Sequence, residues 1–91
     1  MFEIVYSRKV KNDLKLISNY ISLDSPINSI KTVNSILKTI DMLEEFPYIW
    51  KEIEWNIREL VEKKYKYKIV YKIDVNFVII LSIYKYQNTW K

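Results

Sequence analysis

The residues of this chain best suited to contact an anion lie in its last third, Ile57 through Tyr86, where lysines and tyrosines are interleaved. Lysine ammonium groups contact phosphates, and tyrosine rings offer surfaces on which bases stack. The segment YKYKIVYKI alternates with a period of two, which is typical of a β-strand with two different faces. One face would carry Tyr65, Tyr67, Ile69, Tyr71 and Ile73, and the other Lys66, Lys68, Val70 and Lys72. If exposed, the second face would bind phosphates through Lys66, Lys68 and Lys72, with Tyr84 or Tyr86 available for stacking.

Positive charge is concentrated in the same part of the chain. Residues 1–56 contain seven Lys/Arg and eight Asp/Glu, a net charge of −1, whereas residues 57–91 contain eight and three, a net charge of +5. This asymmetry indicates an anionic partner, either nucleic acid or an acidic protein segment. The alternative is a solvated lysine face that keeps a small domain in solution.

The missing residue types restrict the chemistry. The 91 residues include no cysteine, histidine or glycine. Disulfides, thiolate catalysis, the usual neutral-pH general base and glycine-dependent phosphate loops are therefore excluded, and we expect no metal and no cofactor. One of the carboxylates Glu52, Glu54, Glu59 and Glu62 could act as a general base, but such charged runs are more often solvated.

The first half of the chain predicts one strand and two helices. Phe2–Tyr6 is rich in β-branched and aromatic residues, and Ser7 is a good helix cap. A helical stripe of Val10, Leu14, Ile17 and Ile21 ends near residues 23–24. Ser25-Pro26 begins a second helix, which ends at Pro47, with a stripe of Ile30, Val33, Leu37, Ile40, Leu43 and Phe46. The short link predicts an antiparallel helical hairpin.

The second half predicts three strands, at Ile57–Val61, Tyr65–Ile73 and Phe77–Tyr86. Residues 48–56 read as a loop or irregular edge whose two tryptophans, Trp50 and Trp55, either pack over the sheet or offer stacking surfaces. Asp74 or Asn76 would take any positive-φ position in the last hairpin. The prediction is a single α+β domain over residues 1–91, in the order β-α-α-β-β-β, with the helical hairpin on one face of a small, mainly antiparallel sheet.

No signal peptide or membrane-spanning segment is expected, because the N-terminus lacks a charged and apolar leader and the longest apolar run, Phe77–Leu81, is short. The absence of cysteine suits the reducing cytoplasm, where we expect the protein to reside.

An ordered set of short segments resembles the RelE/ParE toxin superfamily of bacterial type II toxin–antitoxin modules, which includes plasmid-stabilisation toxins. The set covers nearly the whole chain: Ile4-Val5-Tyr6-Ser7 with Lys9, Asp13-Leu14, Ile17, Tyr20-Ile21, Ser25-Pro26, Leu43, Phe46-Pro47, Arg58-Glu59-Leu60, Tyr67-Lys68-Ile69-Val70-Tyr71 and Val78-Ile79-Ile80-Leu81. The last strand departs from the pattern, because Tyr84-Lys85-Tyr86-Gln87-Asn88 stands where many members have histidine and arginines.

The resemblance implies where a site would lie. In a ribonuclease of this superfamily, Arg58 would supply positive charge to the phosphate, and Lys85 and Tyr86 would lie where reactive residues end the last strand. Free lysine and tyrosine titrate near ~10, so a base at neutral pH would need a lowered pKa, which a neighbouring Lys68 or Arg58 could provide. The partner-binding set would be Lys66, Lys68, Lys72, Tyr84 and Gln87.

The resemblance also implies a growth-arresting toxin and a cognate acidic antitoxin. The absence of histidine and the long hairpin favour ParE-like inhibition of DNA gyrase. The alternatives are a RelE-like ribosome-dependent endoribonuclease, that is, an mRNA interferase acting without metal on ribosome-bound mRNA, or an inactive basic binding module of the same fold.

Overall fold

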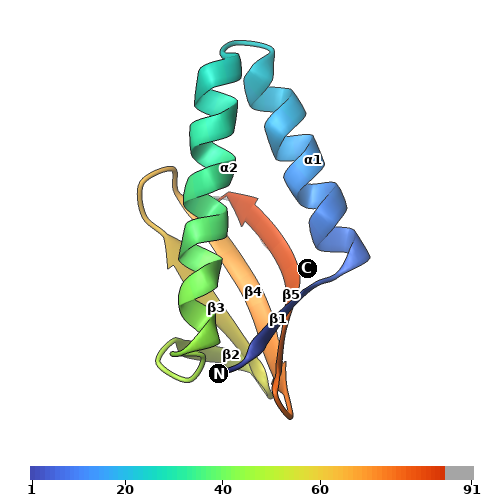
Figure 1. The fold of residues 1–91 in the computed structure, drawn as a ribbon, viewed down its shortest axis with the longest axis vertical. Coiled ribbons are helices and arrows are strands. Elements are labelled where there is room, and N and C mark those ends of the chain that lie inside the picture. Colours follow the sequence, from blue (N-terminus) through green and yellow to red (C-terminus); the bar gives the residue numbers. More distant parts are fainter. Residues whose placement is uncertain (86–91) are drawn as a thin grey trace.

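A computed structural model describes residues 1–85, in which two helices cover one face of a five-stranded sheet (Figure 1). The elements, in chain order, are β1 (Glu3–Tyr6), α1 (Arg8–Ser22), α2 (Pro26–Asp41), the 3-10 turn η1 (Met42–Glu44), β2 (Lys51–Glu54), β3 (Ile57–Glu62), β4 (Tyr67–Asp74) and β5 (Phe77–Lys85). The sheet order is β1-β5-β4-β3-β2, with β1 parallel to β5 and every other pair antiparallel. The predicted fold class is confirmed, and β2 is a strand that the predicted order lacks.

Both helices begin where the sequence predicts. The Ser7 hydroxyl accepts the Val10 N–H at 3.2 Å, and the Ser25 hydroxyl accepts the Asn28 N–H at 3.2 Å. Pro26 occupies the first turn of α2, where its missing N–H costs no hydrogen bond. The short link then turns the chain back, and α1 and α2 lie antiparallel (Figure 1).

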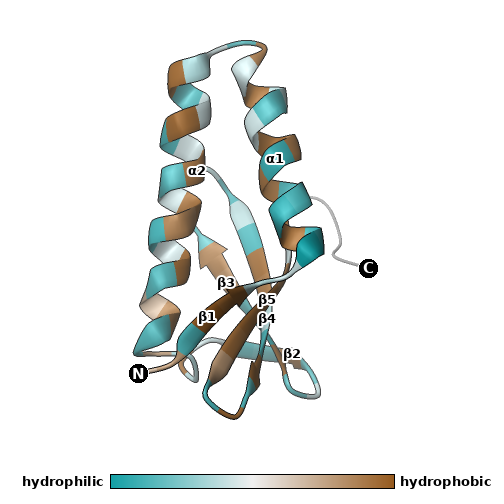
Figure 2. Cartoon of the chain, turned by 45° about the vertical axis from the view of Figure 1, so that its right-hand side comes forward, coloured by the Kyte–Doolittle hydropathy of each residue, from teal (hydrophilic) through white to brown (hydrophobic). Residues whose placement is uncertain are grey.

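The predicted apolar stripe of the second helix is confirmed at Ile40 and Leu43, which are fully buried, and is wrong at its two ends, where Ile30 and Phe46 are exposed. The buried residues are Ser29, Thr32, Ile36 and Ile40, whereas Ile30 is 63% exposed. The reason is that α2 packs against α1 as well as against the sheet, and small polar residues let the two helices approach. The Ser29 hydroxyl donates to the Ser18 carbonyl at 2.8 Å across this contact. Apolar residues are therefore left on the outer surface of the hairpin (Figure 2).

The alternation predicted for β4 is confirmed. Tyr67, Ile69 and Tyr71 are buried in the core between sheet and helices, and Tyr65 and Ile73 pack against it. The same core contains Val10 of α1, Ile36 and Ile40 of α2, Leu43, Leu60 of β3, and Val78, Ile80 and Ile83 of β5. Of the two tryptophans, Trp50 packs on this core, while Trp55 is 88% exposed.

Among residues 1–85, three non-glycine residues take positive φ, as a chain without glycine requires at tight turns. They are Asn56 (φ 61°), Lys66 (φ 68°) and Val75 (φ 54°). Asparagine tolerates this region, but a β-branched valine does not. The prediction of Asp74 or Asn76 is therefore wrong, because β4 and β5 pair through Asp74 and Phe77 and place Val75 first in a two-residue loop.

Candidate functional site

One polar network lies on the sheet face opposite the helices. The Tyr84 hydroxyl donates to Glu59 Oε2 at 2.7 Å, and the Lys68 ammonium lies 3.3 Å from Glu59 Oε1. Burial, and then the bonded carboxylate of Glu59, raise the pKa of Tyr84. Tyr84 therefore stays protonated at neutral pH, where it can donate a proton in a hydrogen bond but cannot serve as a base.

Arg58 lies on the helix-covered face, where it holds the loop that follows Pro47. Its guanidinium donates to the Tyr48 carbonyl at 3.2 Å and to the Trp50 carbonyl at 2.7 Å, and lies 5.5 Å from the centre of the Tyr48 ring. The buried Tyr71 hydroxyl fixes the same loop by donating to the Pro47 carbonyl at 2.6 Å. The contact between Tyr71 and the loop gave no signal in the sequence, because it joins residues 24 positions apart.

Lys85 is also bound to the protein itself. Its ammonium donates to the Tyr65 carbonyl at 2.9 Å and lies 4.6 Å from the centre of the Tyr67 ring. Burial, followed by the charge of Glu62, raises the pKa of that tyrosine. Lys85 thus contacts two tyrosines, Tyr65 and Tyr67, at the end of the sheet.

The structure does not bring Arg58 and Lys85 together. Arg58 pairs with Tyr71 and Lys85 with Tyr67, so the two cations are two strands apart and roughly 13 Å apart along the strand direction. Lys68 pairs with Tyr84 and faces the other side of the sheet from Lys85. The neighbouring cations expected to lower the pKa of a base at Lys85 are therefore not beside it. Tyr86 and Gln87 lie outside the described residues.

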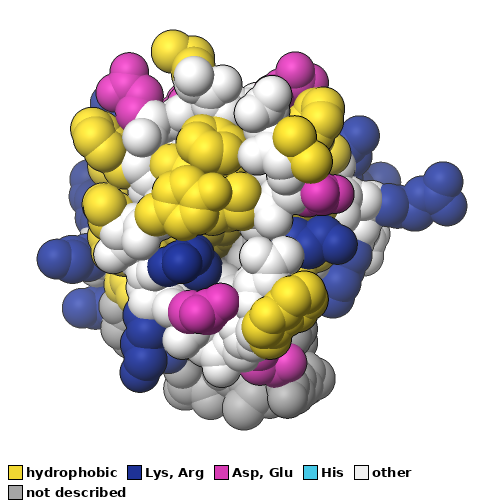
Figure 3. Space-filling model, turned by 90° about the horizontal axis from the view of Figure 1, so that it is seen from below, with side chains coloured by type: hydrophobic (Ala, Val, Ile, Leu, Met, Phe, Trp, Pro, Cys, Tyr) yellow, Lys and Arg dark blue, Asp and Glu magenta, His cyan; other side chains and the backbone are white. Residues whose placement is uncertain are grey.

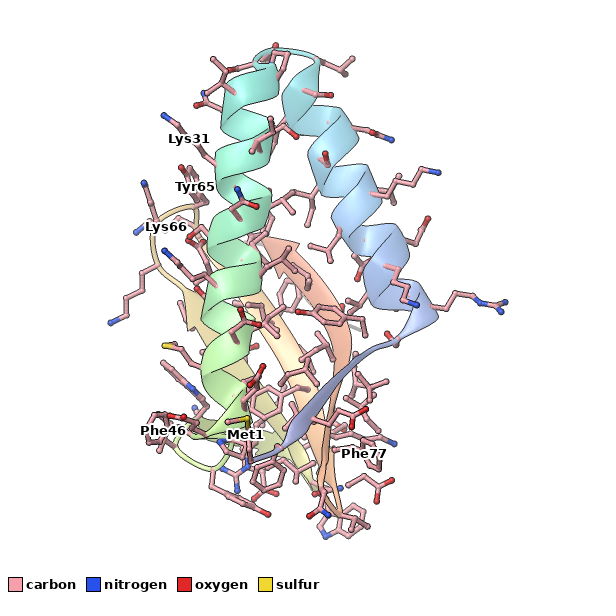
Figure 4. The ribbon with its side chains drawn as sticks, viewed as in Figure 1. Met1, Lys31, Phe46, Tyr65, Lys66 and Phe77 are labelled. Carbon is pink, nitrogen blue, oxygen red and sulfur yellow. The ribbon has the colours of Figure 1, made fainter. Side chains whose placement is uncertain are left out.

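The three predicted phosphate-binding lysines are also separated. Lys68 and Lys72 share one sheet face, with the fully buried Val70 between them, and Lys68 is paired with Glu59. Lys66 lies in the β3–β4 turn, where its positive φ interrupts the strand alternation. Figure 4 shows Lys66 projecting from this turn on the same side of the molecule as Lys31 and Tyr65.

The acidic residues near β2 and β3 have structural contacts. Glu52 accepts the Asn56 N–H at 2.9 Å, and the buried Glu62 accepts Ser35 Oγ at 2.7 Å. Over residues 1–85, no three His, Cys, Asp or Glu side chains are grouped in a way that could hold a metal ion. Within that same range, neither helix has the length and apolar character needed to cross a bilayer.

A groove runs under the overhanging end of the helical hairpin. It consists of two cavities of about 310 Å³ each, which share Tyr20, Tyr67 and Lys85. Leu16 and Ile17 line one cavity and Ile21 the other, so the walls are mostly apolar. Their charged groups are the Lys85 ammonium, which lines both cavities, and the Asp13 carboxylate, which lines one. We call this feature the hairpin groove. The sequence did not reveal it, because it forms only where α1 extends past β5 (Figure 1).

A second apolar surface lies at the opposite end of the molecule. Seen from below, hydrophobic side chains gather at its centre, with charged groups around them (Figure 3). Met1, Phe46 and Phe77 lie at this end (Figure 4), and each is at least 42% exposed. The loop fixed by Arg58 belongs to this surface, because the rings of Tyr48 and Phe2 pack edge to face with their centres 5.9 Å apart.

Comparison with known proteins identifies the class. A family model described as the ParE toxin of the type II toxin–antitoxin system parDE matches residues 4–90, and the chain belongs to this family of toxins. A solved structure described as the chromosomal ParDE toxin–antitoxin system from P. aeruginosa has the same fold, with a TM-score of 0.83 at 20% identity, covering 93% of this chain and 96% of that chain. No curated protein matches the chain.

Proposed function

We propose that this ParE-family toxin arrests growth by binding DNA gyrase, without cutting RNA. The observation that carries this proposal is the placement of Arg58 and Lys85. Both cations bind backbone carbonyls of their own chain, at separate ends of the sheet. Cleavage of RNA through its 2′-OH needs a base, an acid and a phosphate-binding cation around one phosphate.

The fixed loop after Pro47 supports recognition of a protein surface. Three of its carbonyls are bonded by Tyr71 and Arg58, so the loop needs little ordering when a partner binds. It presents Tyr48 and Ile49, which are 61% and 68% exposed, beside other exposed apolar side chains. Aromatic anchors in a preorganised patch are typical of protein–protein hot spots.

The neutralising partner is a cognate acidic antitoxin, for which the hairpin groove offers a site. Its walls suit the apolar side of a peptide, and Lys85 lies where a carboxylate of that peptide would be attracted. The groove is lined by residues of α1 and of the C-terminal end of β5, whereas the loop after Pro47 lies near the opposite end of the sheet (Figure 1). The toxin would therefore meet its target and its antitoxin on different surfaces.

The proposal is tested by translating a defined mRNA on ribosomes with the purified toxin. We expect the message to stay intact, and we expect an Arg58→Gln/Lys85→Gln variant to give the same RNA pattern as the wild type. Ribosome-dependent cleavage that the wild type performs and the double variant loses would contradict the proposal. That result would establish the ribonuclease, with Arg58 and Lys85 in its site.

A further inference from the structure

A basic cavity lies on the outer side of α2, between this helix and the β3–β4 turn. Its volume is about 400 Å³, and it is lined by Lys31, Asn34, Ser35, Lys38, Lys64 and Tyr65. Lys31 and Lys38 are seven residues apart, so they lie on one side of the helix about 10 Å apart along its axis. The turn supplies Lys64, with Lys66 projecting beside it (Figure 4).

These lysines have no carboxylate partner among residues 1–85. Other lysines of the described chain do form ion pairs, Lys9 with Asp13 and Lys68 with Glu59, at other places on the molecule. Lys31, Lys38, Lys64 and Lys66 are all exposed, so their mutual repulsion is reduced by solvent and dissolved salt but is not neutralised by a protein carboxylate. An anion bound in this cavity would relieve that repulsion.

The turn that carries the cavity is held rigid by a buried carboxylate. Glu62 accepts the Lys64 N–H at 3.1 Å and the Tyr65 N–H at 2.9 Å, as well as the Ser35 hydroxyl at 2.7 Å. It thereby links α2 to the turn and fixes the two sides of the cavity relative to each other. The Lys64 ammonium lies 5.4 Å from the centre of the Tyr65 ring, so a cation and an aromatic ring are presented side by side.

We infer that this cavity, the α2–turn site, binds the phosphate backbone of a nucleic acid. Lysines serve phosphates well as point charges, and Asn34 and Ser35 add neutral hydrogen-bonding groups. The distance from Lys31 to Lys38 equals the rise of about three nucleotides of one strand, at ~3.4 Å of duplex axis per nucleotide. Tyr65 adds a ring of the kind on which bases stack in single-strand binding proteins. The site shares only Tyr65 with the hairpin groove, and the inference does not depend on the target of the toxin.

The test measures fluorescence anisotropy of labelled oligonucleotides of about 20 nucleotides, as single-stranded DNA, single-stranded RNA and duplex DNA. The binding constant K is measured between about 50 and 200 mM salt. Each phosphate contact contributes about 0.7 to 0.9 to the magnitude of the slope of log K against log salt concentration, so this slope counts the contacts. For a Lys31→Ala/Lys64→Ala variant, we expect weaker binding and a slope reduced by about 1.5 for at least one of the three probes.

The matched control is Lys11→Ala/Lys15→Ala, which removes two exposed lysines from α1 and gives the same net charge. Circular dichroism confirms that both variants are folded. Equal loss of affinity in the two variants would overturn the site, since it would show attraction by net charge alone. Absence of binding to all three probes at the lower salt, or tighter binding of a polyglutamate peptide than of an oligonucleotide of equal charge, would also overturn it.

Discussion

Individual charged residues of this toxin hold its backbone in place. Arg58 and Lys85, which the resemblance marks as the site of a ribonuclease, bind the carbonyls of Tyr48, Trp50 and Tyr65. Their identities could be read from the sequence, but their partners could not. A guanidinium that binds phosphate and one that binds a loop have the same sequence signature, and only the fold distinguishes them.

Replacing Arg58 should therefore lower stability. Arg58→Ala removes two charge-assisted hydrogen bonds to carbonyls and should reduce the free energy of unfolding by about 2 kcal/mol. Arg58→Lys keeps the charge without the planar fork and should lose about half of that. Urea denaturation followed by tryptophan fluorescence measures both values. A loss in Arg58→Ala of no more than ~0.5 kcal/mol, as at an ordinary surface position, would contradict the loop-holding role.

Tyr84 should make the fold sensitive to high pH. Its pKa in the folded chain is raised by burial and by its bond to Glu59, above the value of about 10 expected in the unfolded chain. The stabilisation that this shift represents is complete below about pH 10 and is lost as the pH rises toward the raised pKa. Denaturation midpoints measured from about pH 8 to pH 11 should fall in the wild type.

A Tyr84→Phe variant provides the comparison. Because it lacks the hydrogen bond to Glu59, its free energy of unfolding at neutral pH should be lower by about 1 kcal/mol. Its denaturation midpoint should also fall less steeply than that of the wild type as the pH rises. The part of the decline that remains belongs to Tyr6, Tyr67 and Tyr71, whose pKa values burial also raises. If the denaturation midpoint fell as steeply with rising pH in the variant as in the wild type, ionisation of Tyr84 would not be a cause of the alkaline loss of stability.

At the level of helices and strands, the local signals predicted the fold well. Serine caps and the period-two alternation of β4 act through neighbouring residues, and both are confirmed. The unpredicted features depend on distant partners. β2 is a strand because β3 pairs with it, despite its charged sequence KEIE. The face of α2 is set by its contact with α1, where Ser29 and Ser18 meet.

The backbone strain at Val75, in the hairpin between β4 and β5, can be tested directly. Val75 takes φ 54°, is 80% exposed, and so gains little from burial to offset its backbone strain. Val75→Asn should stabilise the protein by about 1 kcal/mol, because asparagine tolerates this region. The melting temperature should then rise by about 4 to 8 °C. Val75→Thr keeps the β-branch and should give no gain, so equal gains in the two variants would rule out strain as the cause.

At the scale of the whole molecule, the sheet separates two surfaces of different character. The hairpin groove lies at one end, and the loop held by Arg58 lies at the other (Figures 1 and 4). Neither surface could be predicted from the sequence, because each combines residues from distant segments. The notable pattern in the sequence was the positive charge of the last third. Among residues 1–85, the structure divides those lysines between the sheet face, the β3–β4 turn and, for Lys85, the hairpin groove.

The hairpin groove predicts a selective effect on neutralisation. Leu16→Glu places a charge in its wall and should prevent rescue by the co-expressed antitoxin, while toxicity remains. Ile27→Glu is the matched control, because Ile27 is a similarly exposed apolar residue that lines neither cavity. Growth with and without the antitoxin gene measures the effect. Full rescue of Leu16→Glu would exclude the groove as the antitoxin site.

The central claim is that the toxin acts on gyrase by contact with protein. The most direct measurement is a titration of purified gyrase with the purified toxin, read as supercoiling of relaxed plasmid and as cleaved DNA complexes. We predict that supercoiling is inhibited or cleaved complexes accumulate, and that Ile49→Glu in the fixed loop abolishes the effect while the protein stays folded. Full supercoiling and no cleaved complex at saturating toxin would contradict the claim.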